Sequence, residues 1–263
     1  MIKNTFEKWM AVVEKDGSLL EYVPKDNKTY IMCLKATKQY PYALKFVPKR
    51  FKSIQICFTS VKQNGITLQF IPEECMNYEM CLIAVKNTGK ALKYVPDKYK
   101  TCEICNIALE TYPYAMEFVP EKYKTYSMCK KVVKKSGLCI QYIPRIHLLY
   151  ELCIEAVREN GSALVYIPSR YKTYDLCLEA VNSDGLSLYY IPQKYRTYEL
   201  SIKAVKQNRM AIIYVPEKYK TQEFYNEING SSIKNKLIKP FIDNGKYIFK
   251  YIPSKIKEDL QLN

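Results

Sequence analysis

Nine prolines recur at a fixed interval of 24 residues, with no insertion between any two of them. They are Pro24, Pro48, Pro72, Pro96, Pro120, Pro144, Pro168, Pro192 and Pro216. A fixed period of this length indicates a repeat architecture, in which each unit is too small to bury its own apolar face and stacks on its neighbours. The period therefore predicts one continuous array over residues 1–228.

The first part of each repeat is predicted to be an α-helix. An apolar pattern with helical spacing, such as Met80, Cys81, Ala84 and Val85, follows a residue suited to cap the helix. The predicted N-caps are Thr5, Thr29, Thr101, Thr125, Thr173, Thr197 and Thr221. Carboxylates at the second helical position suit the helix dipole. They are Glu79, Glu103, Glu151, Asp175, Glu199 and Glu223. The glycines that follow the helix are predicted to be left-handed stops. They are Gly17, Gly65, Gly89, Gly137, Gly161 and Gly185.

The second part of each repeat, as in "KALKYVP", is predicted to be a short helix of about six residues, because apolar groups stand at relative positions one, two, four and five. Proline cannot continue the helical hydrogen bonds, so this helix ends at the aromatic-Val/Ile-Pro step. A leucine-rich repeat is the alternative, but the chain lacks the spacing L-x-x-L-x-L. The predicted fold class is all-α, an α-solenoid of about nine 24-residue helix-turn-helix repeats.

The C-terminal segment departs from the period. The segment that matches the end of a repeat, "FKYIP", closes only at Pro253, later than the period allows after Thr221. Terminal repeats of solenoids are commonly atypical. Residues 229–263 are therefore predicted to form a modified capping repeat of the same domain.

Two segments, "SVKQNGITLQFIPEEC" and "AVRENGSALVYIPSRYK", resemble the repeats of a domain-of-unknown-function family. That family occurs as multi-copy arrays in effectors of intracellular bacteria and in giant viruses. The resemblance extends over residues 1 to about 228 and implies an all-helical fold. The proline after the aromatic-Val/Ile step is a departure, since family members often carry serine there. The family brings no agreed activity.

Seven of the ten cysteines share one repeat position, where Trp9, Ser201 and Tyr225 stand in other repeats. They are Cys33, Cys57, Cys81, Cys105, Cys129, Cys153 and Cys177. A position that accepts such varied residues needs a packing group, so reduced thiols in a cytoplasmic, reducing compartment are predicted. Delivery into a host cell stays open. Charges interrupt every apolar stretch, so neither a signal peptide nor membrane insertion is expected.

Little in the sequence points to catalysis. His147 stands in an aromatic column, where it is interpreted as a substitute for tyrosine or phenylalanine. Cys102 and Cys105 form a lone CxxC, whereas a structural zinc site needs two further ligands. The chain is accordingly predicted not to be an enzyme and to have no catalytic residues, cofactor or metal site.

Charge is the remaining signal, since the formal net charge is +15. In six repeats the turn after the proline places two basic residues around an aromatic one. The basic residues are Arg50, Lys52, Lys98, Lys100, Lys122, Lys124, Arg170, Lys172, Lys194, Arg196, Lys218 and Lys220. Glu74-Cys75-Met76 and Ile146-His147-Leu148 interrupt this series in the third and sixth turns.

Two interpretations of these turns remain open. In one, the aromatic rings pack onto the next unit and the lysine stems cover apolar surface. In the other, the charged heads are exposed along one edge and bind an acidic partner. The sequence predicts a non-catalytic scaffold that binds another macromolecule, and it favours a protein. The alternative is a nucleic-acid-binding array that uses the same basic edge.

Overall fold

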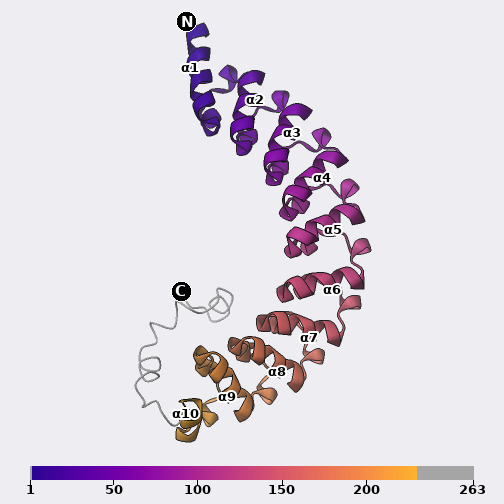
Figure 1. Cartoon of the computed structure of the whole chain (residues 1–263), viewed down its shortest axis with the longest axis vertical. Helices are drawn as coiled ribbons and strands as arrows, with labels where there is room; N and C mark the ends of the chain where they lie inside the picture. The colour runs from indigo at the N-terminus through magenta and orange to yellow at the C-terminus, as the bar shows by residue number, and fades with distance from the viewer. Residues whose placement is uncertain (1, 230–263) are drawn as a thin grey trace.

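The computed structural model describes residues 2–229, and the side chains of residues 6–228. The capping repeat predicted for 229–263 falls outside these residues, except for its first residue. The described chain forms a curved array of stacked units that contains helices and no strand (Figure 1). We number nine units from cap to turn: 5–28, 29–52, 53–76, 77–100, 101–124, 125–148, 149–172, 173–196 and 197–220.

Each unit contains an α-helix, a six-residue 3₁₀-helix and a three-residue 3₁₀ turn. The α-helices are α1 Ile2–Lys15, α2 Tyr30–Gln39, α3 Ile54–Gln63, α4 Tyr78–Asn87, α5 Cys102–Thr111, α6 Tyr126–Lys135, α7 Tyr150–Glu159, α8 Tyr174–Ser183, α9 Tyr198–Gln207 and, after the ninth unit, α10 Gln222–Asn229. The six-residue helices are η1 Gly17–Tyr22, η3 Pro41–Phe46, η5 Gly65–Phe70, η7 Gly89–Tyr94, η9 Pro113–Phe118, η11 Gly137–Tyr142, η13 Gly161–Tyr166, η15 Gly185–Tyr190 and η17 Arg209–Tyr214. The turns are η2 Lys25–Asn27, η4 Lys49–Phe51, η6 Glu73–Cys75, η8 Asp97–Tyr99, η10 Glu121–Tyr123, η12 Arg145–His147, η14 Ser169–Tyr171, η16 Gln193–Tyr195 and η18 Glu217–Tyr219.

The predicted threonine caps are confirmed for most units. The Thr101 hydroxyl, for example, accepts a hydrogen bond from the Ile104 amide at 3.3 Å. Ser53 and Asn77 take the same role where threonine is missing. The prediction was wrong for Thr5, which lies inside α1. Residues 2–4 contain no proline or glycine, so the helix extends through them.

The second helix of each unit has the predicted length, but it is a 3₁₀-helix rather than an α-helix. In η7 the amide that closes the helix, that of Val95, donates to the Leu92 carbonyl at 3.2 Å. Val95 is extended, with ψ 125°, because the following Pro96 excludes the helical region for the residue before it. With only six residues between two extended ones, bonds from residue i to i+3 satisfy the backbone.

The glycines do not act as left-handed stops, so that prediction was wrong. None of the six glycines that the structure describes has a left-handed φ. Instead each one lies against the α-helix of the next unit. A Cβ on Gly65 would stand 2.1 Å from the Ala84 carbonyl oxygen, and one on Gly137 2.2 Å from that of Ala156. Glycine is needed here because two backbones approach more closely than any side chain allows.

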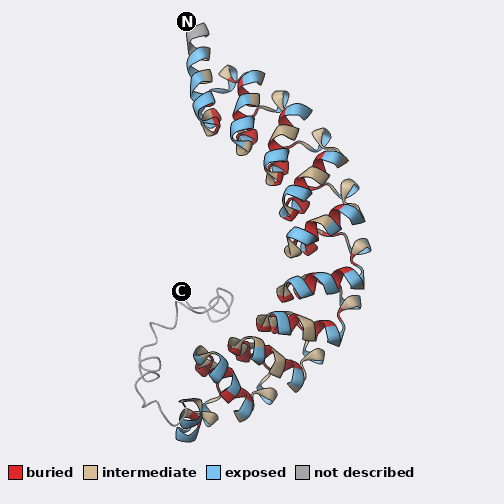
Figure 2. Cartoon of the chain, viewed as in Figure 1, coloured by how far each residue is buried: buried red, intermediate tan, exposed pale blue. Residues whose placement is uncertain are grey.

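The core is a continuous layer between the α-helices and the six-residue 3₁₀-helices. In unit 4 it contains Met80, Cys81, Ala84 and Leu92, all fully buried, and equivalent residues repeat along the array. Figure 2 shows buried positions recurring along each α-helix, alongside exposed ones. In Figure 1 the three-residue turns follow the outer, convex edge, and the C-terminal ends of the α-helices face the inner, concave edge. The turns therefore occupy corresponding places along one edge of a regular array.

Among the described residues, no helix combines the length and the apolar character that crossing a bilayer requires.

Candidate partner-binding edge

The second basic residue joins neighbouring units in three of the six pairs. The ammonium groups of Lys52, Lys124 and Lys172 donate to backbone carbonyls 18 residues further on, those of Phe70, Tyr142 and Tyr190 respectively. Each carbonyl belongs to the last residue of the six-residue helix in the next unit, where the helix dipole favours a cation. Burial lowers the pKa of Lys52 and of Lys172.

The interpretation in which the basic heads are exposed along the edge therefore does not hold for this second column. The side chains of Lys100 and Lys124 are only 13% and 7% exposed. Lys100 pairs with Asp97 at 2.8 Å, and Lys220 pairs with Glu217. Arg196 instead donates to two carbonyls of its own unit. Sequence reasoning missed these contacts because the carbonyl acceptors belong to the folded backbone, which leaves no mark in the residue types.

The first basic residue of each pair is exposed, and it lies over the aromatic ring that follows it in the chain. Lys122 lies 4.9 Å from the centre of the Tyr123 ring, and Arg170 lies 4.8 Å from that of Tyr171. The same arrangement recurs at Arg50, Lys98, Lys194 and Lys218. Such a contact at an exposed site contributes about 0.5–1 kcal/mol, so each ring holds a cation in place. We call these six exposed residues the cation row.

Most of the cation row has no acidic partner. Within residues 6–228, only Lys98 of the six forms an ion pair, with Glu73 at 3.1 Å. The hydrogen bond that Lys98 donates to Glu73 raises the pKa of Lys98. The other five cations are exposed and form no ion pair, so most of the row is a positively charged edge.

The rings beneath the cations are half-buried and pack against the core. The Tyr99 hydroxyl donates to the Met76 carbonyl at 3.1 Å, which joins unit 4 to the preceding unit rather than to the next one. In unit 9 the Tyr219 ring meets Tyr198 edge to face, with centres 5.9 Å apart. The rings therefore pack into the array as one interpretation expected, although these contacts are with the preceding unit or the ring's own unit rather than with the next one. The heads of the first basic column are exposed, as the other interpretation expected.

The third turn interrupts the row with two carboxylates. Glu74 pairs with Lys49 at 2.7 Å, and Glu73 reaches Lys98 in the next turn. A hydrogen bond from Lys49 lowers the pKa of Glu74. This part of the edge is locally neutralised.

The sixth turn interrupts the row with apolar side chains. Ile146 stands where the other turns carry a cation, and Leu148 takes the place of the buried lysine. Leu149 replaces the cap, and α7 begins without a side-chain cap. His147 lies with its ring centre 6.5 Å from that of Tyr126, which matches its interpretation as a substitute aromatic.

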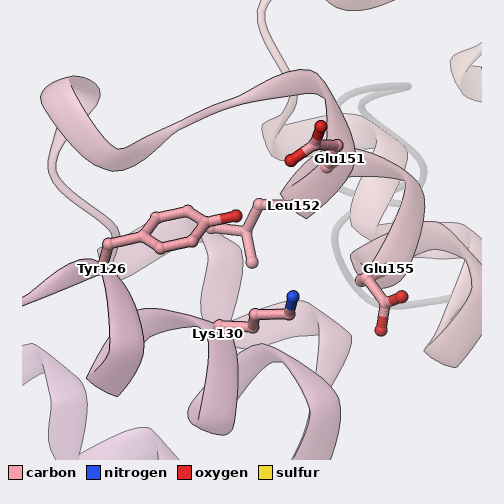
Figure 3. Close-up of a pocket in the computed structure, with 5 residues that line it drawn as sticks. All are labelled: Tyr126, Lys130, Glu151, Leu152 and Glu155. Atoms are coloured by element: carbon pink, nitrogen blue, oxygen red, sulfur yellow. The ribbon is translucent and has the colours of Figure 1, made fainter.

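A shallow cavity of about 220 Å³ lies between α6 and α7, next to this turn. Figure 3 shows Tyr126 and Lys130 on one side and Glu151 and Glu155 on the other. Its lining mixes one basic and two acidic side chains, so it carries little net charge and contributes nothing to the positive edge.

The seven cysteines of the repeat column are free and fully buried, as predicted. Burial raises the pKa of each of these thiols to about 11, so they stay protonated at neutral pH. Cys102 is exposed, whereas Cys105 belongs to the buried column. The described residues contain no group of three histidine, cysteine or acidic side chains placed to hold a metal ion.

Comparison with known proteins identifies the repeat. A family described as "Domain of unknown function (DUF4116)" matches residues 5–52, 31–76, 53–100, 77–124, 150–196 and 173–220. The chain belongs to this family. Each DUF4116 match spans about two of the units defined above, and the matches cover every unit except the sixth. No curated protein matches the chain, and no solved structure matches it.

The unit that the DUF4116 matches leave out, 125–148, is the one that ends in the apolar sixth turn. It still contains α6, η11 and η12 at the usual places. The departure is therefore in the side chains of the edge and not in the fold. In the sequence this turn is visible as an interruption of the basic series, and the hydrophobic residue in a column of cations is the signal that marks it.

Proposed function

We propose that the chain is a non-catalytic scaffold that binds another protein through its outer edge. The observation that carries the proposal is the cation row: side chains held over aromatic rings, repeated along a regular array, and mostly without acidic partners. Lysine and arginine heads held in fixed positions lose less conformational entropy when they bind an acidic surface. Their positive field also accelerates the encounter with such a surface.

Two features of the reactive side chains support a non-catalytic role. His147 packs beside Tyr126 in a position where other units carry tyrosine. The column thiols are buried and protonated at neutral pH, which makes them poor nucleophiles. Ten free cysteines, with Cys102 exposed to oxidants, support a reducing compartment such as the cytoplasm.

A protein partner is favoured over nucleic acid because the edge is not uniformly positive. Glu73 and Glu74 occupy the third turn and Ile146 the sixth, which divides the row into segments. A phosphate backbone carries charge at every nucleotide, so it gains from an unbroken basic track. A protein surface can place neutral or apolar groups opposite the interruptions.

The test compares two variants with the same number of charge reversals. The edge variant carries Lys98→Glu, Lys122→Glu, Arg170→Glu and Lys194→Glu. The control carries Lys38→Glu, Lys62→Glu, Lys86→Glu and Lys134→Glu, which changes exposed lysines at the other end of the α-helices. Each is immobilised, and the proteins and nucleic acids captured from cell extract are quantified with and without nuclease.

The proposal requires a nuclease-resistant set of proteins that the wild type and the control capture and the edge variant loses. Both variants should stay folded with the helical content of the wild type. The edge variant should be less stable by about 2–4 kcal/mol, because it loses four cation–π contacts. Capture that is equal for both variants, or that disappears with nuclease, would overturn the proposal. In the second case the array binds nucleic acid.

A further inference from the structure

The sixth turn carries an apolar patch in the middle of the outer edge. Ile146, Leu149 and Tyr150 are 81%, 46% and 36% exposed, respectively. Ile146 occupies the position that holds an exposed cation in most other turns. An isoleucine this exposed buries almost no apolar surface and so does not stabilise the fold. The side chains at the equivalent position of the other turns are exposed as well.

Unpaired positive charge flanks the patch on both sides. Lys122 precedes it by one unit, and Arg170 and Lys194 follow it by one and two units. Within the described residues none of these three cations forms an ion pair, although five other turn lysines do. Ser169 and Gln193 stand where other turns have a carboxylate. The turns of units 6–8 thus contain basic residues and no acidic one.

The spacing of the edge fits an extended polypeptide. Helices in stacked units pack roughly 8–10 Å apart, so equivalent side chains on successive turns lie on the order of 10 Å apart. An extended segment in the polyproline II conformation advances about 3.1 Å for each residue and has three residues per turn, so every third side chain lies on the same face. Every third residue of such a segment therefore meets the same position of the next unit.

We infer that the edge from unit 5 to unit 8 binds an extended acidic segment of a partner protein, with acidic side chains at every third residue and one apolar side chain seated on Ile146, Leu149 and Tyr150. This inference rests on the proposed function and specifies its partner. The acidic groups meet Lys122, Arg170 and Lys194, and the apolar group is the anchor that sets the register. Charge complementarity then increases the rate at which the two proteins associate, and the apolar anchor makes binding specific for one register of the segment.

Other partners fit the edge less well. Nucleic acid would place a phosphate over the exposed Ile146, and that phosphate would lose contacts with water without gaining a cation in return. A lipid surface is locally flat, whereas the turns follow a convex arc, so it would contact only the units near one point (Figure 1). An extended peptide can follow the curve over all four units.

The experiment uses the full chain and a synthetic peptide with glutamates at every third place and a leucine at the central place, labelled for fluorescence anisotropy. Two further peptides serve as probes: one with the same composition but glutamates at every second place, and one with the central leucine changed to glutamate. We expect each change to weaken binding by about tenfold, which corresponds to 1.4 kcal/mol.

A charge swap at the patch gives a sharper readout. Ile146→Lys restores the usual turn pattern, so this variant should prefer the all-glutamate peptide over the leucine-centred one, the reverse of the wild type. Ile31→Lys is the matched control, because Ile31 is an exposed isoleucine on α2, in unit 2, well away from the patch in sequence. It should keep the wild-type order of peptides.

The inference is overturned if the wild type does not distinguish the three peptides, or if Ile146→Lys leaves their order unchanged. Binding of anionic phospholipid vesicles or of a single-stranded oligonucleotide that depends on Ile146, without peptide binding, also overturns it. If none of the peptides binds while the edge variant still loses the proteins that the wild type captures, this inference is rejected and the proposed function stands. If capture is also insensitive to the edge, the proposed function falls with it.

Discussion

The fourth and sixth turns of the array occupy equivalent positions in the fold but carry different side chains. In the fourth, Lys98 lies over Tyr99, Lys100 pairs with Asp97, and Thr101 caps the next helix. In the sixth, Ile146 is exposed, Leu148 is buried, and Leu149 offers no cap. The three-residue 3₁₀ turn nevertheless has the same length and the same closing hydrogen bonds in both.

The layer beneath the two turns explains why the fold tolerates this difference. Leu92 before the fourth turn and Ile140 before the sixth are both buried in the core, as are Cys105 and Cys153 after them. In a solenoid each unit is stabilised by its neighbours, so an unbroken buried layer maintains the stack. The edge is then free to vary, and variation there changes what the array can bind.

The largest expected effect is a loss of stability at alkaline pH. It tests whether the buried layer is equivalent beneath the two turns. Burial raises the pKa of eight thiols from 9.0 to about 11. A raised folded-state pKa contributes stability that is fully present below pH 9 and is lost as pH rises towards 11. Ionisation of each thiol in the unfolded chain then lowers the free energy of unfolding by on the order of 2 kcal/mol, so the array should unfold between pH 9 and 11.

Thermal melting followed by circular dichroism from pH 7 to 11 measures this loss. Cys105→Ala, beside the fourth turn, and Cys153→Ala, beside the sixth, should each reduce the pH dependence by the same amount. A much smaller reduction for Cys153→Ala would mean that the layer beneath the sixth turn is open to solvent, and the two regions would no longer share one core.

The next effect sharpens the same comparison at neutral pH. Leu92→Ala and Ile140→Ala each leave a cavity in the buried layer and should each lower the free energy of unfolding by about 2–5 kcal/mol. Urea denaturation gives both values. Near-equal losses support a uniform core, whereas a loss below about 1 kcal/mol for Ile140→Ala would show that unit 6 is loosely packed.

The smallest effect concerns the turns themselves. Thr101→Ala removes a helix cap and should cost about 1 kcal/mol, whereas Leu149→Thr adds a cap where none exists and should gain a similar amount. Both changes are measured by urea denaturation at pH 7. If Leu149→Thr instead lowers stability, the exposed Leu149 contributes to the fold, and its assignment to a binding patch is wrong.

Much of the unit was predictable because its determinants are local. The cap at Thr101 needs only the amide three residues later, and Pro96 restricts only the residue before it. The burial of the cysteine column followed from the varied residues that share its position. The role of Gly65 was predicted incorrectly because the clash that excludes a side chain comes from Ala84, in the next unit.

The sequence by itself determined the period, the helical units and the residues of the buried layer, since these depend on spacing along the chain. Only the tertiary structure decided which charges face solvent. Lys98 and Lys100 stand two residues apart and look alike in the sequence, yet Lys98 is exposed and Lys100 is largely buried. The difference arises because the second lysine column lies within reach of a carboxylate of its own turn or of a backbone carbonyl that stacking brings from the next unit. The first column lies over its aromatic rings, in contact with water.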